Sequence, residues 1–320
     1  MGLGGITTGG GIGYLVRKFG MTIDALLAAD VVTADGKLLR VDADHHPDLF
    51  WAIRGGGSNF GVVTRFQFRL DEVPTIVGGM LLLPATPETI AGFVAAAEAA
   101  PDELTTIGNV MPTPPMPFVP EERHGELAIL ALMCYAGDAE PGQEAMAPFR
   151  ALAEPIADLV HPMPYPEIYP PDSDEYHPRA AGRTLFVDRV DEDVAETILA
   201  KVKASTGQMA VAQLRVLGGA MSRVPVDATA FAHRKSRILV NLAAIYESPD
   251  DKATHETWVA DFAAALRQSD HGAYVNFVGD EGDAGVRAAY PDATRHRLAD
   301  IKRRYDPDNL FRLNQNIPPA

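Results

Sequence analysis

The first thirteen residues, MGLGGITTGGGIG, contain seven glycines. Glycine is favoured where the backbone must adopt positive φ or approach a ligand closely, and ordering it costs more conformational entropy than ordering other residues. A dinucleotide loop of the Rossmann type requires a strand directly before the glycines and a helix after them. No strand precedes these glycines, and the Gly-Lys-Ser/Thr of a P-loop is absent. The stretch is therefore either a ligand-contacting loop or a structural turn, and a nicotinamide-binding βαβ unit is not expected.

The composition limits the class of partner. The 320 residues include 28 Lys and Arg against 43 Asp and Glu, a formal charge of −15. Nucleic acids and anionic membranes bind clustered positive charge, so we expect neither as a partner. No apolar stretch approaches the ~20 residues that span a bilayer, and no secretion signal is recognisable. The single cysteine, Cys134, allows no intrachain disulfide, so we expect a cytoplasmic protein with Cys134 buried.

Short strands and helices follow one another without regular βαβ order. Residues 26–41 predict a hairpin around an Asp35-Gly36 turn, and residues 60–70 alternate as a strand with one solvated face. In the middle of the chain, strands are predicted at 126–137, 183–187, 208–219 and 237–246. Helices are predicted at 87–100 with Thr86 as the cap, at 141–156, at 191–205 and at 249–267. Proline-rich irregular runs are predicted at 111–125 and 161–180. This order indicates an α+β fold with an antiparallel sheet.

The C-terminal part predicts a short strand at 273–279 and then a helix capped by Asp292. Leu298, Ile301 and Tyr305 share one face of that helix, as an amphipathic core-facing helix requires. The basic run 302–304 in its last turn is expected to complement the helix dipole. An extended polar tail follows.

Two further stretches are candidates for chemistry. Gly55, Gly56, Gly57 and Gly61 surround Ser58 and Asn59; backbone amides freed by glycines suit phosphates or a ribose, and the alternative is a tight entry into a strand. Phe60 stands where the last glycine of a nucleophile elbow belongs, so that motif is rejected. Tyr274 and Asn276 alternate on the predicted strand, so a phenol and an amide point the same way. That pair suits proton abstraction, or is an ordinary satisfied edge. The histidines lack the spacing of metal ligands, and no metal is expected.

Residues 9–70 and 305–319 resemble the berberine bridge enzyme-like family of FAD-linked oxidases, which has the vanillyl-alcohol-oxidase (PCMH-type) flavin fold. Residues 217–234 and 273–309 are similar to its bacterial members. The resemblance implies a partial PCMH-type FAD-binding domain from residues 1–76, its second subdomain, together with a C-terminal return at 271–320. Residues 77–270 would form a substrate-binding domain whose antiparallel sheet, covered by helices, roofs the isoalloxazine.

The resemblance also implies the cofactor-binding residues. They are Gly9, Gly10, Gly11 and Gly13 along the flavin and its phosphates, Val31 in the following strand, Asn59, Phe60, Gly61 and Val63 on the nucleotide side, and Asn276, Asn314 and Gln315 returning to the flavin. Tyr274 is the implied catalytic base, in a Y-x-N-Y motif that here ends in Phe277. Tyr246 is a second candidate phenol on the active face of the sheet.

In this family a segment upstream of the first glycines carries a pyrophosphate loop and the histidine that bonds covalently to the flavin. Neither motif is found here, so the first FAD subdomain and the covalent histidyl attachment site are expected to be absent from this chain. The expected activity is transfer of a hydride from an alcohol, sugar or secondary metabolite to FAD, with oxygen as acceptor. The alternative is a non-catalytic family remnant or a small-molecule-binding module.

Overall fold

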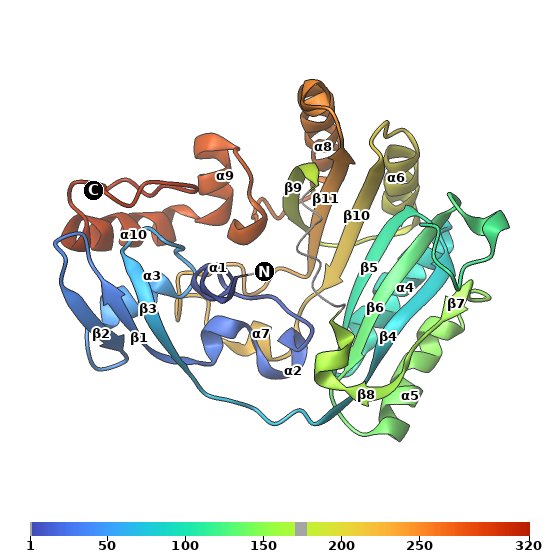
Figure 1. Ribbon diagram of the computed structural model, residues 1–320, viewed down its shortest axis with the longest axis horizontal. Helices are drawn as coiled ribbons and strands as arrows, with labels where there is room; N and C mark the ends of the chain where they lie inside the picture. The colour runs from blue at the N-terminus through green and yellow to red at the C-terminus, as the bar shows by residue number, and fades with distance from the viewer. Residues whose placement is uncertain (1, 170–177) are drawn as a thin grey trace. The chain divides into compact units, whose positions relative to one another are not determined.

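The computed structural model describes residues 2–169 and 178–320, which form two compact units. Unit 1 comprises Met1–Asp71, Gly219–Lys235 and Gly272–Ala320, and unit 2 comprises Glu72–Gly218 and Ser236–His271. The resemblance placed residues 219–235 in the substrate-binding domain 77–270, but this segment packs within unit 1. All paired strands are antiparallel, which confirms the α+β class (Figure 1).

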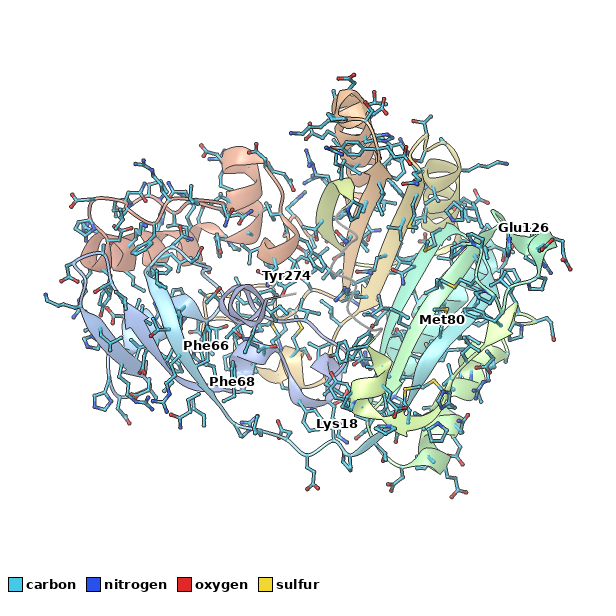
Figure 2. All side chains as sticks on the ribbon, viewed as in Figure 1. Lys18, Phe66, Phe68, Met80, Glu126 and Tyr274 are labelled. Atoms are coloured by element: carbon cyan, nitrogen blue, oxygen red, sulfur yellow. The ribbon has the colours of Figure 1, made fainter. Side chains whose placement is uncertain are left out.

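Unit 1 is built on a three-stranded sheet in the order β2-β1-β3. The predicted hairpin is β1 (Leu26–Val32) and β2 (Leu38–Asp42), and Gly36 in its turn has φ +76°. The predicted strand after the second glycine cluster is β3 (Val62–Phe68). Phe66 and Phe68 lie on one face of β3 with their rings stacked 5.9 Å apart (Figure 2). Period-two alternation therefore placed these strands correctly.

The other elements of unit 1 are helices and 3₁₀ turns. They are α1 (Leu3–Gly9), α2 (Val16–Phe19), α3 (Pro47–Ile53), α7 (Gly219–Arg223), α9 (Gly282–Ala289) and α10 (Asp292–Tyr305), with the 3₁₀ turns η1 (Thr22–Asp24) and η5 (Val275–Phe277). Leu298, Ile301 and Tyr305 of α10 are buried with residues of α3 in one apolar cluster, as the helical periodicity predicted. The C-terminal residue bonds back to α10, from Ala320 N to Ala299 O at 3.2 Å.

Three local predictions in unit 1 are wrong. The glycine-rich start is partly helical, because the Thr7 and Thr8 hydroxyls bond to carbonyls four residues earlier and α1 runs through the first glycines. The segment around Asn276 is the turn η5 and not a strand, because the amides of Phe277 and Val278 bond back to Tyr274 O. Asp292 begins α10 without capping it, since no side chain caps this helix.

Unit 2 contains an eight-stranded sheet in the order β7-β4-β6-β5-β10-β11-β9, with β8 also paired to β4. Its strands are β4 (Thr75–Pro84), β5 (Leu104–Pro112), β6 (Leu127–Tyr135), β7 (Ala157–Asp158), β8 (His161–Pro164), β9 (Arg179–Val187), β10 (Met209–Val216) and β11 (Ile238–Tyr246). The predicted strands of the middle region all appear here. β8 begins the run 161–180 that was predicted to be irregular, and residues 170–177 of that run lie outside the described residues.

Helices cover one face of this sheet (Figure 1). They are α4 (Pro87–Ala99), α5 (Ala139–Arg150), α6 (Glu192–Lys203) and α8 (Lys252–Leu266), with short 3₁₀ turns η2 (Glu121–Arg123), η3 (Tyr165–Ile168) and η4 (Pro249–Asp251). The Thr86 hydroxyl accepts from Thr89 N at 3.1 Å and caps α4 as predicted, and Pro148 lies inside α5. Cys134 is fully buried in β6, where burial raises the pKa of its thiol to about 12.

Within residues 2–169 and 178–320, no helix combines the length and apolar character that crossing a bilayer requires. The cytoplasmic location stays a prediction.

Candidate functional site

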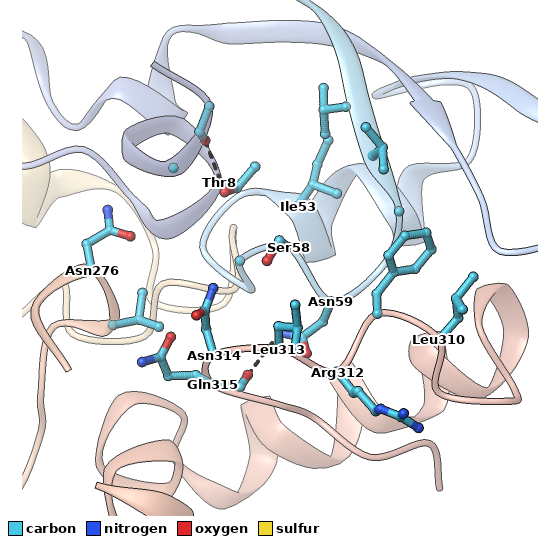
Figure 3. A pocket seen from close by; sticks show the side chains of 18 of the residues that line it. Thr8, Ile53, Ser58, Asn59, Asn276, Leu310, Arg312, Leu313, Asn314 and Gln315 are labelled. Atoms are coloured by element: carbon cyan, nitrogen blue, oxygen red, sulfur yellow. Dashed lines mark hydrogen bonds between the residues drawn. The ribbon is translucent and has the colours of Figure 1, made fainter. Parts of the chain in front are cut away.

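Unit 1 contains a pocket of about 490 Å³, a volume within the range of small-molecule sites. It is bounded by α1, the loop after α3, the beginning of β3, the residues of η5 and the C-terminal tail (Figure 3). Six residues implied to bind the cofactor line it: Asn59, Gly61, Val63, Asn276, Asn314 and Gln315. Six others do not line it: Gly9, Gly10, Gly11, Gly13, Val31 and Phe60. The structure therefore gathers half of the predicted set around one cavity.

The second glycine cluster forms one wall of this pocket and also enters β3. Gly55 has φ +124°, and a Cβ there would collide with the backbone nitrogen of Phe231. Gly61 has φ +152°, and a Cβ there would meet Val32 O and the Val31 side chain. Glycine is therefore required at both positions because other chain segments approach the backbone closely. Of the two interpretations of this cluster, the tight strand entry is what these contacts describe, and the ligand role stays a prediction.

Asn59 connects this loop to the tail. Its Nδ2 donates to Gly56 O at 2.9 Å and to Gln315 O at 3.1 Å, and its Oδ1 accepts from Ile317 N at 3.0 Å. Only 4% of the residue is exposed. Both amide hydrogens are used by the protein, so the Asn59 side chain shapes the pocket wall and has no N–H left for a ligand.

The tail crosses the pocket as an arch with two fixed ends. Leu310 N and Phe311 N donate to Asp306 at one end; at the other end lie the bonds from Asn59, together with Gln315 Nε2 donating to Val278 O at 2.8 Å. Between the ends, residues 312–314 are exposed and line the pocket. We call residues 312–314 the tail arch.

Two buried charges support this arrangement. Lys302, the first of the three basic residues expected to complement the dipole of α10, is fully buried, as is Asp306. Burial opposes ionisation of Asp306, but the hydrogen bonds from Lys302, Phe311 N and Leu310 N outweigh it and hold the pKa of this carboxyl below its ordinary value. The sequence offered no sign of this pair, because a Lys-x-x-x-Asp spacing at a helix end is typical of a solvated surface pair.

Several polar groups of the pocket have no partner in the described residues. Ser58, Arg312 and Asn314 line the cavity, and their side chains have no hydrogen-bond partner in the described part of the chain. In Figure 3 the side chains of Ser58 and Asn314 lie close together, whereas that of Arg312 extends away from them. Apolar residues alternate with them around the wall: Ile53, Val62, Val63, Phe66, Val275, Leu310 and Leu313. Leu313 is 80% exposed and Leu310 63%. An apolar wall with a few convergent polar groups is the usual composition of a cofactor pocket.

Tyr274 lies beside the first glycines (labelled in Figure 2) and is 2% exposed. Its phenol oxygen accepts from Gly11 N at 2.9 Å, from Ile12 N at 3.3 Å and from Asn276 Nδ2 at 2.9 Å. The prediction that the phenol and the amide point the same way is thus confirmed, although through a turn. Because a phenol oxygen has two lone pairs, its acceptor capacity is filled by the chain itself.

The glycines around Tyr274 are close-packed. A Cβ at Gly9 would overlap the Asn276 amide, and Gly10 and Gly11 have φ of +136° and +86°. Gly13 has open space around it, whereas Val31 and Phe60 are buried in the core of unit 1. Of the two interpretations of this stretch, these contacts describe a structural turn, and its contact with a cofactor stays a prediction.

Tyr246 lies at the end of β11 in unit 2. It belongs to the apolar cluster beneath α6 and α8, and its ring stacks on His255 of α8 with centroids 5.1 Å apart. This is the helix-covered side of the sheet. The prediction that Tyr246 lies on the active face of the sheet is therefore wrong, because the strand register turns its side chain toward the helices.

The opposite face of the same sheet carries a row of polar residues that was not predicted from the sequence. Asn109, Gln213, Asn241 and Thr184 are paired in register across β5, β10, β11 and β9. Gln213 Nε2 donates to Asn109 Oδ1 at 2.8 Å, and Arg215 Nε donates to Gln213 Oε1 at 2.8 Å. The Asn241 amide has no partner among the described residues. The sequence signal that could have revealed this row is a polar side chain within each of several otherwise apolar strands.

No group of three or more His, Cys, Asp or Glu side chains in the described part of the chain is arranged to hold a metal ion.

Comparisons with known proteins identify the family. The family model described as "Berberine and berberine like" matches residues 273–318, and the model described as "FAD binding domain" matches residues 1–42. A FAD-linked oxidoreductase of Dictyostelium discoideum is 30% identical over 330 residues, which cover 99% of this chain and 68% of that protein. The chain belongs to the berberine bridge enzyme-like family of FAD-linked oxidoreductases.

Solved structures of similar proteins have the same fold. 6-Hydroxy-D-nicotine oxidase of Arthrobacter nicotinovorans has a TM-score of 0.86 at 23% identity, and xylooligosaccharide oxidase of Myceliophthora thermophila has 0.82 at 25%. Each match covers 100% of this chain and 72% of the other. The resemblance drawn from the glycine and tail motifs is confirmed. The particular similarity to bacterial members and the lack of a covalent flavin link stay predictions.

The pocket of unit 1 fits part of a FAD molecule. A flat, partly apolar ring system requires an apolar wall, which Phe66, Val63 and Leu310 provide. The ribose and ring edges require hydrogen-bonding groups, which Ser58 and Asn314 offer without internal partners.

Proposed function

We propose that the chain is a FAD-dependent oxidoreductase whose unit 1 pocket holds part of the cofactor. The observation that carries this proposal is that Ser58, Arg312 and Asn314, whose side chains have no partner among the described residues, all line one partly apolar cavity. Bound FAD supplies a two-electron acceptor. The protein supplies orientation and electrostatics.

The pocket residues have distinct proposed roles. The Arg312 guanidinium contacts the anionic phosphates, because it is the one charged side chain among the described residues lining the cavity. Asn314, and the carbonyl oxygen of the Gln315 side chain, bind the polar edges of the cofactor. The glycines at 9–13 do not line this pocket, and their proposed role is to present backbone groups to a part of the cofactor that extends beyond it. Tyr274, the proposed base, must first release its own phenol proton, and its oxygen can then take a proton from the substrate where one of its three N–H donors is displaced.

The proposed substrate is a small molecule with an oxidisable hydroxyl or amine, among alcohols, sugars and secondary metabolites, and oxygen is the proposed final acceptor. Relatives named xylooligosaccharide oxidase and 6-hydroxy-D-nicotine oxidase show how different the substrates of similar proteins are. In unit 2, the row containing Gln213 and Asn241 is the proposed substrate-contacting surface, because amide side chains can donate to and accept from hydroxyl groups.

The first experiment is the visible spectrum of the purified full chain before and after incubation with FAD and desalting. We expect a retained flavin band and a saturable titration. Arg312→Met should weaken FAD binding about tenfold, equivalent to about 1.4 kcal/mol, whereas Arg303→Met, an exposed residue that does not line the pocket, should not.

A colourless protein with no titration would overturn the proposal. A chain that binds FAD but takes up no oxygen with panels of alcohols, sugars and amines would favour the non-catalytic binding module. Uptake with one panel alone would assign the substrate class, and Asn241→Ala should then raise KM for that substrate.

A further inference from the structure

Lys302 occupies the junction of the two pocket walls. Its Nζ donates to Asn59 O in the glycine loop at 2.7 Å, to Phe311 O in the tail at 2.6 Å, and to Asp306 Oδ2 at 2.5 Å. An ammonium group has three N–H bonds, so the protein itself uses all three. One side chain thus binds α10, the loop and the tail at a single point.

Asp306 completes the junction from the other side. Its Oδ1 accepts from Leu310 N at 2.8 Å and its Oδ2 from Phe311 N at 2.9 Å. Leu310, Phe311 and Asn59 are all pocket-lining residues. The ion pair therefore holds the start of the tail arch, and through Asn59 it reaches the other end of the arch as well.

A gain in stability does not by itself explain why the Lys302–Asp306 ion pair is buried. Taking two charges out of water is costly, and replacing a buried ion pair by apolar residues of similar volume is often neutral or stabilising. What apolar residues cannot provide is a bond to each of four backbone groups, Asn59 O, Phe311 O, Leu310 N and Phe311 N. Two of these groups lie on one pocket residue, Phe311, and one, Asn59 O, lies in the glycine loop.

We infer that Lys302 and Asp306 are positioning residues, which hold the glycine loop and the tail arch at the separation that the cofactor requires. This inference rests on the proposed function. Without the bonds from Lys302 and Asp306, the tail would adopt the binding conformation for only a fraction of the time. The apparent dissociation constant for FAD rises in inverse proportion to that fraction.

The test compares two double variants of the full chain. Lys302→Met with Asp306→Leu removes both buried charges and leaves no unpaired ion. Arg303→Met with Asp300→Leu is the matched control, because it removes an exposed pair on the same helix, 3.2 Å apart and 60% and 61% exposed. FAD titration and amide hydrogen exchange of residues 310–317 are measured on each, with unfolding curves to establish that each is folded.

We expect the buried-pair variant to bind FAD at least tenfold more weakly and to exchange the tail amides at least tenfold faster. At saturating FAD its flavin spectrum should match that of the parent, since the pocket residues are unchanged. The control should change neither quantity. Asp306→Asn, which keeps the size of the side chain, takes the place of the double variant if that variant does not fold.

An unchanged FAD affinity, or a tail that stays protected, would overturn the inference. If the parent chain itself binds no FAD, the proposed function fails, and the exchange comparison still decides whether the pair orders the two pocket walls.

Discussion

Substituting Tyr274 by Phe tests whether this residue anchors residues 9–13 or acts only as a catalytic base. The substitution deletes the phenol oxygen and preserves the ring. That oxygen accepts from Gly11 N, Ile12 N and Asn276 Nδ2. Asn276 keeps a second acceptor, Ile6 O at 3.5 Å, and the bond from Ile12 is the longest of the three. The buried Gly11 amide is thus the donor that loses the most, because its 2.9 Å bond to the phenol oxygen is removed.

Leaving a buried donor unsatisfied costs about 1–3 kcal/mol. With the weaker bonds added, we expect Tyr274→Phe to lower the opening free energy of residues 9–13 by about 2–3 kcal/mol. At about 1.4 kcal/mol per factor of ten, the amides there should exchange ~30- to 160-fold faster. Hydrogen exchange measured by mass spectrometry on a peptide covering these residues reports this directly.

Tyr246→Phe is the matched control. It also deletes a phenol oxygen from a buried tyrosine, but that oxygen has no hydrogen-bond partner among the described residues and the stack on His255 remains. Little change is expected in exchange or stability. Should Tyr274→Phe leave exchange at 9–13 within about threefold of the parent while abolishing substrate oxidation, Tyr274 would be a base without an anchoring role, and the reasoning above would be refuted.

Three other results are expected. Gly55→Ala should destabilise unit 1 by at least ~2 kcal/mol in denaturant unfolding, because the added Cβ meets the backbone of Phe231; an effect below ~0.5 kcal/mol would contradict the close approach. Asp306 has a lowered pKa when folded, so its stabilising contribution is complete above the unfolded pKa of about 3.9 and is lost as pH falls through the folded value. The stability difference between the parent and Asp306→Asn should therefore shrink on acidification below about pH 4, and a constant difference would show that Asp306 is not ionised. Cys134, with a thiol pKa raised to about 12, should resist thiol reagents at pH 8 until the chain unfolds, and rapid labelling of the native chain would contradict its burial.

The sequence predicted best those elements whose signal is local and periodic. The hairpin at Gly36, the cap at Thr86 and the apolar face of α10 each depend on residues within a few positions of one another. The wrong predictions concern segments whose local structure depends on contacts with other parts of the chain. Residues 274–278 have the alternation of a strand, but the amides of Phe277 and Val278 bond back to Tyr274 O and form η5. The first glycines contain a helix because threonine hydroxyls and packing against η5 outweigh the low helix propensity of glycine.

Part of the candidate site could be found from motifs, because those motifs mark segments that must come close together. Asn59 and Gln315 do meet at the pocket, but their bond is to each other. A motif residue can therefore act on a cofactor by shaping the cavity while its own side chain stays inaccessible to the ligand. The residues left without partners, Ser58, Arg312 and Asn314, are the ones a ligand can still bind, and only Asn314 was predicted among them. The hydrogen bonds of the folded chain distinguish residues that shape the cavity from residues that can still bind a ligand. No pattern in a single sequence makes this distinction.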